Sequence, residues 1–227
     1  MAFRYSPKIV TDGLVLYLDA ANTKSYVSGS TAWNDISRSN INGVLINGPT
    51  FSSDGGGSIL FDGSNDYAQI NYGGNLSSST ITLNFFAKHN GPRDERRTML
   101  GLSNGGNFAF LTYNMQIWDT TSEYISFVGD GTTYTTYGFN IPNTFQSWNH
   151  FAVVISPTTI KNYVNGQLTY NSTSITLRGV FDRIWLGTRG NQNWKGWIPN
   201  FQLYNRELSA TEVLQNYNAT KSRFGLI

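Results

Sequence analysis

Short stretches in which apolar and polar residues alternate recur along most of the chain, separated by clusters of Gly, Asn, Asp and Ser. Alternation with a period of two is typical of strands that bury one face, and regularly spaced runs of this kind indicate a sandwich or a barrel. The sequence therefore predicts an all-β domain. Its expected strands lie at 14–18, 58–61, 67–70, 80–86, 108–113, 124–128, 148–155, 159–164, 167–170, 183–187 and 198–204.

Two local signals predict a tight turn and a helix. The dipeptide Asn165-Gly166 separates two alternating runs and favours a type I′ hairpin, because both central residues of that turn need positive φ. The segment Ser209-Ala-Thr-Glu212 has the pattern of a capping box at a helix N-terminus. We expect one short helix over 209–217 that covers one end of the sandwich. Its expected apolar stripe consists of Val213, Leu214 and Tyr217.

No linker or charge run divides the chain, so a single domain is expected over residues 13–217, including the helix. Residues 1–12 are expected to form a partly extended N-terminal arm. The segment 55–57 is three glycines and is expected to be a flexible loop. Residues 218–227 are expected to form a C-terminal tail that docks through Phe224, Leu226 and Ile227.

Composition excludes several classes of protein. The 227 residues contain 16 basic and 14 acidic side chains, and a net charge of +2 is too small to indicate a nucleic-acid partner. The longest apolar run, 151–155, is far shorter than the ~20 residues of a membrane-spanning helix, so no membrane insertion is expected. The absence of Cys excludes disulfides and thiolate zinc sites. Aromatic residues make up 15% of the chain, which is enough to build a large core.

Four segments in a fixed order resemble a known family. They are Phe61-Asp-Gly-Ser-Asn-Asp-Tyr67, Trp148-Asn-His150, Tyr163-Val-Asn-Gly166, and the stretch from Trp194-Lys-Gly196 through Tyr204-Asn-Arg-Glu-Leu-Ser209. Together they look like the laminin-G-like branch of the concanavalin A-like lectin/glucanase superfamily. The resemblance implies an antiparallel two-sheet jelly-roll sandwich with one short C-terminal helix. This chain departs from the family at Pro199 and Asn200, where the common pattern has an acidic pair.

The opening residues 8–26 and the ending residues 208–225 resemble a narrower group, the single-domain laminin-G-like proteins of tailed bacteriophages. This resemblance implies a non-enzymatic structural protein of the virion, most simply an exposed capsid decoration or particle-surface subunit that docks through its terminal arms. Other virion proteins, such as capsid or tail subunits, would be its partners. Head and tail locations both stay open, as does assembly into homo-oligomers.

Several single residues carry structural expectations. Trp148 is expected to fill space between the two sheets, and the missing side chain at Gly196 is expected to let an aromatic ring lie across the backbone. His150 alternates with apolar neighbours, so we expect a buried structural histidine. His89 lies beside Asn90-Gly-Pro92, so we expect an exposed loop residue.

An enzymatic function is not expected. A retaining glucanase needs two carboxylates about 5–5.5 Å apart, which a strand supplies through acidic residues at every second position. None of the glutamates has an acidic residue two positions away, and no G-x-S-x-G nucleophile motif is present. A glucanase-like glycosidase is therefore the least favoured alternative. The glutamates are Glu95, Glu123, Glu207 and Glu212.

The main alternative is a receptor- or glycan-binding adhesin of a tail or fibre, with host cell-surface glycans as partners. Jelly-roll lectins use aromatic platforms and amides, although a sandwich of this size also needs many buried aromatic residues. No cofactor is predicted, and calcium stays open, since Asp62, Asp66 and Asp130 suit turns as well as calcium ligation. The candidate carbohydrate-binding residues are Trp118, Tyr134, Tyr137, Trp194 and Trp197.

Overall fold

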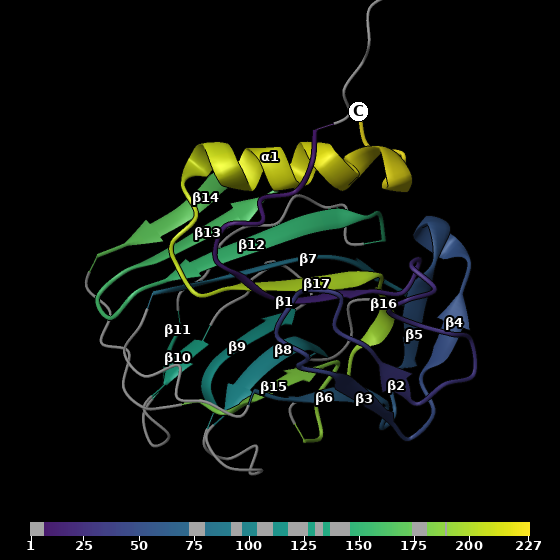
Figure 1. Cartoon of the computed structure of the whole chain (residues 1–227). Coiled ribbons are helices and arrows are strands. Elements are labelled where there is room, and N and C mark those ends of the chain that lie inside the picture. Colours follow the sequence, from purple (N-terminus) through teal and green to yellow (C-terminus); the bar gives the residue numbers. More distant parts are fainter. Residues whose placement is uncertain are drawn as a thin grey trace, which may run out of the picture.

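The structure is a computed structural model in which two antiparallel sheets face each other and one helix lies on the outer side of one sheet (Figure 1). Within the described residues, no helix combines the length and the apolar character needed to cross a membrane. The structure describes residues 7–72, 80–91, 97–103, 111–117, 127–129, 134–136, 146–173, 181–188 and 190–227.

The nine-stranded sheet is organised around β7. On one side of β7 the order is β12, β13, β14; on the other side β7 pairs with β17 along one half and with β16 along the other. Strand β17 continues to β1, and β16 continues to β5 and β4. The strands are β1 Leu14–Asp19, β4 Thr50–Ser52, β5 Ser58–Asp62, β7 Ile81–His89, β12 Asn149–Ile155, β13 Ile160–Val164, β14 Gln167–Ser172, β16 Lys195–Ile198 and β17 Asn200–Tyr204.

The eight-stranded sheet has the order β11-β10-β9-β8-β15-β6-β3-β2. Its strands are β2 Ala32–Trp33, β3 Gly43–Ile46, β6 Tyr67–Asn71, β8 Arg97–Ser103, β9 Leu111–Ile117, β10 Phe127–Gly129, β11 Tyr134–Thr136 and β15 Arg183–Leu186. The helices are α1 Ala210–Thr220 and two short 3-10 turns, η1 Asp54–Gly56 and η3 Lys221–Phe224. The predicted jelly-roll sandwich with one C-terminal helix is confirmed.

The space between the sheets is filled by alternate residues of the strands. Phe85 of β7 and Phe151 of β12 lie there with ring centroids 5.4 Å apart, because facing residues of paired strands project to the same side. The two fully buried tryptophans of this core are Trp33 and Trp194. The burial of these rings removes a large apolar area from water, which is the main force that holds the two sheets together.

Helix α1 lies across the outer face of the nine-stranded sheet, rather than over one end of the sandwich as predicted (Figure 1). Ala152 and Val154 of β12 point to this outer side and form a second cluster with Val213 of α1. All seven residues of β12 are therefore buried. The predicted apolar stripe is wrong at Leu214, which is 38% exposed.

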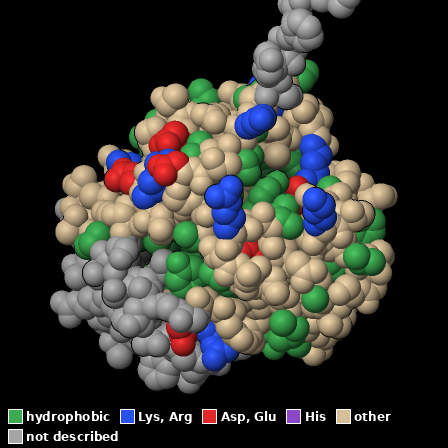
Figure 2. Space-filling view, in the orientation of Figure 1, with side chains coloured by type: hydrophobic (Ala, Val, Ile, Leu, Met, Phe, Trp, Pro, Cys, Tyr) green, Lys and Arg blue, Asp and Glu red, His purple; other side chains and the backbone are tan. Residues whose placement is uncertain are grey.

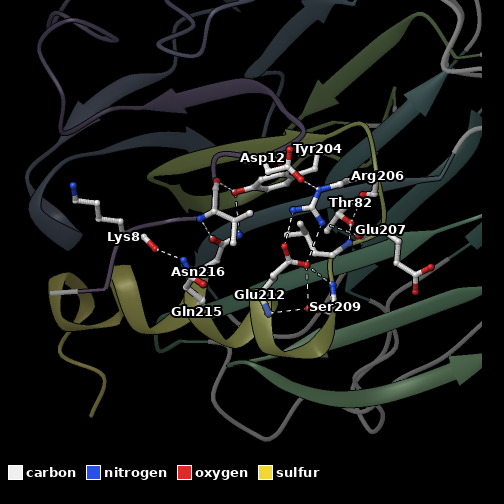
Figure 3. A network of polar contacts seen from close by, with 12 residues as sticks. Lys8, Asp12, Thr82, Tyr204, Arg206, Glu207, Ser209, Glu212, Gln215 and Asn216 are labelled. Carbon is white, nitrogen blue, oxygen red and sulfur yellow. Dashed lines mark hydrogen bonds and ion pairs between the residues drawn. The ribbon is translucent and has the colours of Figure 1, made fainter. Parts of the chain in front are cut away.

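Residues 8–12 form a strap between α1 and β17, and we call this segment the N-terminal strap. Asn216 connects three parts of the chain: its Oδ1 accepts from the backbone N–H of Val10 at 2.8 Å, and its Nδ2 donates to the Tyr204 hydroxyl at 3.0 Å (Figure 3). The Tyr204 hydroxyl lies 3.0 Å from the Val10 carbonyl and donates to it. The side chain of Asn216 is fully buried, so these hydrogen bonds satisfy groups that water cannot reach.

The capping box is present as predicted, and it belongs to a larger charged cluster. Ser209 Oγ accepts from the backbone N–H of Glu212, and the Glu212 carboxylate accepts from the backbone N–H of Ser209. Arg206 binds the same carboxylate at 2.6 Å and Asp12 of the strap at 2.9 Å (Figure 3). The Arg206 hydrogen bond is the largest cause that lowers the pKa of Glu212 to about 2.

The C-terminal tail docks onto the sandwich through Phe224 and Leu226, as predicted. The predicted contact of Ile227 is wrong, because this last residue is fully exposed. Phe224 stacks on Phe86 with centroids 4.2 Å apart and lies 4.9 Å from the ring of Trp148. Trp148 therefore belongs to this outer cluster, and its predicted place between the sheets is wrong, because it stands just before β12 and beside α1 and η3. The helix also continues beyond the predicted residue 217, to Thr220.

Arg223 holds the triple-glycine loop, which was predicted to be flexible. Its guanidinium donates to the carbonyls of Gly55, at 2.6 Å, and of Gly57, and it forms an ion pair of 2.7 Å with Asp19. A Cβ at residue 55 would lie 2.9 Å from the Phe224 ring, so the tail approaches this loop closely only because the loop has no side chains. The loop is thus a docking site for the tail.

Two further expectations are wrong and one is confirmed. His89 ends β7 and is 4% exposed, with its ring 5.2 Å from that of Trp194, so it is not a loop residue. At Gly196 the backbone of β7, rather than an aromatic ring, takes up the space, because a Cβ there would clash with the Lys88 carbonyl. The Asn165-Gly166 turn has positive φ at both residues and joins β13 to β14, as predicted.

Asn216→Ala is expected to destabilise the fold by about 1–3 kcal/mol, because it leaves the buried Val10 N–H without its acceptor and removes a donor from Tyr204. Urea denaturation followed by circular dichroism measures the change. The matched control is the exposed neighbour Gln215→Ala, which loses one hydrogen bond to Lys8 and is expected to stay within about 0.5 kcal/mol of wild type. Equal effects of the two variants would contradict the role given to Asn216.

The contribution of Glu212 to stability is expected to depend on pH. Its pKa is lowered from 4.5 to about 2 in the folded state, so the stabilisation is complete above pH 4.5 and is lost as the pH falls towards 2. Glu212→Gln is therefore expected to destabilise the protein at pH 7 and to differ little from wild type near pH 2. Urea midpoints of both proteins across this range measure the difference. A difference that does not shrink on acidification would show that the charge of Glu212 is not what stabilises the fold.

Candidate functional site

Strands β2 and β3 of one sheet come near β4, the edge strand of the other (Figure 1). A groove of about 380 Å³ opens beside them. Two chain segments line it: the turn that precedes β2, and the connection from β3 to β4. Its volume lies at the lower end of the range of about 300–1,000 Å³ typical of small-molecule sites. The lining residues are Tyr26, Ser28, Gly29, Ser30, Thr31, Leu45, Asn47, Gly48, Pro49, Thr50 and Phe51.

An aromatic pair gives the groove its apolar surface. Phe51 is 40% exposed on β4, and its ring stacks on Tyr26 with centroids 6.1 Å apart and an interplanar angle of 20°. Tyr26 itself is only 3% exposed and belongs to the main core. The core therefore holds Tyr26, and Tyr26 in turn supports a phenyl ring that faces solvent. Such a pair is worth about 0.5–1.5 kcal/mol beyond the area it buries.

The rim of the groove is built from turns that hydrogen bonds hold in place. Asn47 has a φ of 66°, and its side-chain amide donates to the carbonyl of Asn65 at 2.9 Å. The backbone N–H of Leu45 donates to the Thr31 carbonyl at 2.7 Å, which joins the two lining segments. Gly48 has a φ of 103°, a conformation that L side chains rarely adopt. No atom lies within 4 Å of a Cβ placed at Gly48, so the groove is open there.

The chemistry of the lining is neutral. It combines the Phe51 ring with hydroxyls and an amide, which both donate and accept hydrogen bonds, and none of its described residues is charged. Figure 2 shows few charged side chains on the face that it presents, and the densest group of them carries both signs. A groove of this kind suits an uncharged ligand with an apolar face and several hydroxyl groups. The exposed polar residues that line it are Ser28, Thr31, Asn47 and Thr50.

Of the five predicted carbohydrate-binding residues, the structure describes the side chains of two, Trp194 and Trp197. Trp194 is 1% exposed and packs in the core, so its indole offers no surface to a ligand. Trp197 is half-buried; its Nε1 donates to Ser52 Oγ at 3.1 Å, and the Lys88 ammonium lies 4.7 Å from its ring. Trp118 and Tyr137 lie outside the described residues, and Tyr134 is described only as part of the backbone of β11. Sugar binding at these positions stays a prediction.

Sequence analysis missed the groove because its residues give no local signal. Phe51 stands in a three-residue strand and Tyr26 in a turn, and neither position shows a motif. The two residues are 25 positions apart and meet only when the two sheets pack.

His150 lies inside the second hydrogen-bonded layer on the outer side of the nine-stranded sheet. His150 is fully buried, and its Nε2 lies 2.7 Å from Asn84 Oδ1, which accepts from the neutral ring. Burial lowers the pKa of His150 to about 3, so the ring is uncharged at neutral pH. The structural role predicted for this residue is confirmed.

The aspartates proposed for calcium serve turns where the structure describes them. Asp62 Oδ1 accepts from the Ser64 N–H at 2.7 Å, and Asp66 Oδ2 accepts from the Asp62 N–H at 3.0 Å. Burial raises the pKa of Asp66. Among the residues that the structure describes, no three acidic or histidine side chains group as metal ligands. Asp130 lies outside them, so calcium binding stays open.

The two facing antiparallel sheets define the class of this protein: it is a jelly-roll sandwich of the concanavalin A type. The sequence agrees, since residues 62–214, about two thirds of the chain, match the laminin G family model described as concanavalin A-like lectin/glucanases superfamily. The chain belongs to this superfamily. The groove residues 26–51 lie before the matched segment.

Solved structures of the same fold are similar over nearly the whole chain. The binding domain of botulinum neurotoxin DC in complex with rat synaptotagmin II has a TM-score of 0.74, 12% identity, and coverage of 93% of this chain and 52% of its own. A structure of botulinum neurotoxin type C, whose cell entry depends on interaction with two ganglioside molecules, has a TM-score of 0.72, 13% identity, and coverage of 92% and 52%. Trypanosoma rangeli sialidase has a TM-score of 0.72, 16% identity, and coverage of 93% and 33%.

The chain spans about half the length of the botulinum structures and a third of the sialidase. A comparison with curated proteins found no significant match. At these identities the structural likeness establishes the fold, and the function must be argued from the groove itself.

Trp194→Ala is expected to destabilise the domain by about 3–5 kcal/mol, since it removes a large buried side chain and leaves a cavity. Loss of sugar binding in that variant would therefore not identify a binding residue. Trp197→Ala, at a half-buried position, is the matched control and is expected to lose less than half as much stability. Thermal and urea unfolding measure both. If Trp194→Ala were as stable as wild type, its side chain would not be a core residue in solution.

Proposed function

We propose that this domain is a non-enzymatic binding module that recognises carbohydrate on a cell surface through the groove at β2, β3 and β4. The observation that carries the proposal is the lining itself: a core-supported, exposed phenyl ring beside hydroxyl and amide groups, with no charge among its described residues. Aromatic surface and a few placed polar groups are what a small-molecule site needs for affinity and orientation.

The names of similar structures support a binding role. Two are botulinum neurotoxin structures: one is a binding domain in complex with rat synaptotagmin II, and for the other, type C, cell entry depends on interaction with two ganglioside molecules. Both are thus named for binding, and the part that is similar to this chain is about half of each. For this chain the same role is part of the proposal, because the identity is 12–13% and the chain spans about half of each of those proteins.

The non-enzymatic part of the proposal is supported by what the described carboxylates do. Glu207 pairs with Lys161 and Glu212 with Arg206, so both side chains are engaged in ion pairs on the outer face. At the position where the family pattern has an acidic residue, Asn200 Oδ1 accepts from the backbone N–H of Phe86 at 3.0 Å. This hydrogen bond joins β17 to β7, so the Asn200 side chain has a structural role.

We propose in addition that the module is displayed on a bacteriophage particle, as a decoration or tail component with other virion proteins as partners. The resemblance of residues 8–26 and 208–225 to phage proteins supports this placement. Val10 and Phe224 are buried within the domain itself. Docking through the terminal segments would therefore use their exposed parts, such as Ile227.

Binding of the purified protein to intact bacterial cells and to their extracted surface polysaccharide tests the proposal. Phe51→Ala is expected to weaken binding at least tenfold, because it removes the exposed ring of the groove. Val44→Ala is the matched control: it truncates an apolar side chain of similar exposure, 48%, on β3 outside the groove lining. The control is expected to bind like wild type.

Immunogold labelling of the phage that encodes the chain tests its placement. Gold over the head would support decoration, and gold at the tail tip or fibres would support an adhesin. Particles without label, together with absence of cell binding, would overturn both parts of the proposal.

A further inference from the structure

The residue types that line the groove favour one class of saccharide over others. We infer that it takes a neutral saccharide of about mono- to disaccharide size, without calcium, and that one sugar ring packs on Phe51. This inference rests on the proposed function and deepens it. Three properties of the groove support it: the described lining has no charged residue, it has no acidic metal ligand, and its aromatic pair of Tyr26 and Phe51 is rigid.

Charge is the first argument. A sialic or uronic acid carries a carboxylate, and transfer of that group into a groove removes part of its hydration. Recognition of carboxylates generally uses a cation, most often an arginine that donates two hydrogen bonds. The described lining offers Ser, Thr, Asn, Tyr and backbone groups and no Lys or Arg. An anionic sugar would therefore lose hydration there without a compensating charge, whereas neutral hydroxyls would find matching donors and acceptors.

Calcium independence follows from the same lining. Calcium takes six to eight oxygen ligands and normally needs several carboxylates. None of the described lining residues is acidic. Asp62 and Asp66, the predicted calcium candidates that the structure describes, accept backbone hydrogen bonds within their own turn. A sugar in the groove would therefore contact protein groups directly.

Rigidity is the third argument. Tyr26 is held by the core on one side, and its backbone N–H donates to the Asn22 carbonyl at 2.9 Å, so the support under Phe51 is fixed before any ligand arrives. The Asn47 amide is likewise tied to Asn65. A prearranged site loses little conformational entropy on binding, which favours weakly interacting ligands such as neutral sugars. The C–H face of a pyranose is apolar and would cover the exposed part of the Phe51 ring.

An array of immobilised neutral oligosaccharides and their sialylated or uronic-acid counterparts tests the inference, with calcium or with EDTA. We expect binding to one or more neutral members, at least tenfold weaker binding to the acidic counterpart of each, and no change in EDTA. Phe51→Ala is expected to lose this binding and Val44→Ala to retain it. Thr50→Lys, which adds a cation to the lining, is expected to raise binding of the acidic counterpart relative to the neutral sugar. Circular dichroism of each variant confirms that it is folded.

The outcomes separate this inference from the proposed function. Binding to the cells with preference for acidic sugars, or binding abolished by EDTA, would overturn the inference and leave the binding module in place. If the protein binds cells but binds no saccharide on the array, the inference is likewise overturned and the binding module stays in place. Neutral binding that survives Phe51→Ala would place the sugar elsewhere on the domain and so overturn the inference. Absence of binding to both cells and saccharides would overturn the inference and the proposed function together.

Discussion

Burial of both faces of β7 is the constraint on which the rest of the structure depends. All but one of its nine residues are buried, and it pairs with β12 on one side and with β16 and β17 on the other. Its outward side chains include the polar Thr82 and Asn84, which need partners once water is excluded. Thr82 donates to the Arg206 carbonyl, and Asn84 donates to Gln202 and accepts from His150. The outer face is therefore a second, partly polar core.

Both ends of the chain complete this second core. The N-terminal strap reaches Asn216 and Tyr204 through hydrogen bonds, and the C-terminal tail places Phe224 on the ring of Phe86. Arg223 of the tail donates a hydrogen bond to the Gly55 carbonyl in the triple-glycine loop. Segments that look like free arms in the sequence are thus parts of the fold, and their contacts are long-range in sequence. The edge strand β4 still exposes the Phe51 ring to solvent.

The groove at this edge strand shows how a rigid sandwich can carry a site that belongs to its loops. The core holds Tyr26, which supports the exposed ring, and the loops supply the polar rim. The family match begins after the groove residues, so the superfamily accounts for the scaffold and not for this site. Its neutral lining of hydroxyl, amide and aromatic groups is the basis of the binding function proposed for it.

The sequence alone determined those features whose interactions join residues close together in the chain. The capping box of Ser209 and Glu212, the Asn165-Gly166 hairpin and most strands were predictable, because their hydrogen bonds and periodicity are local. The tertiary packing of the two sheets and of the segments that cover them decided where the aromatic residues lie. Whether an aromatic residue lies between the sheets, as Trp194 does, or outside them, as Trp148 does, depends on which distant segment covers it. The groove belongs to this second group, since its two rings come from segments 25 residues apart and become neighbours only through tertiary packing.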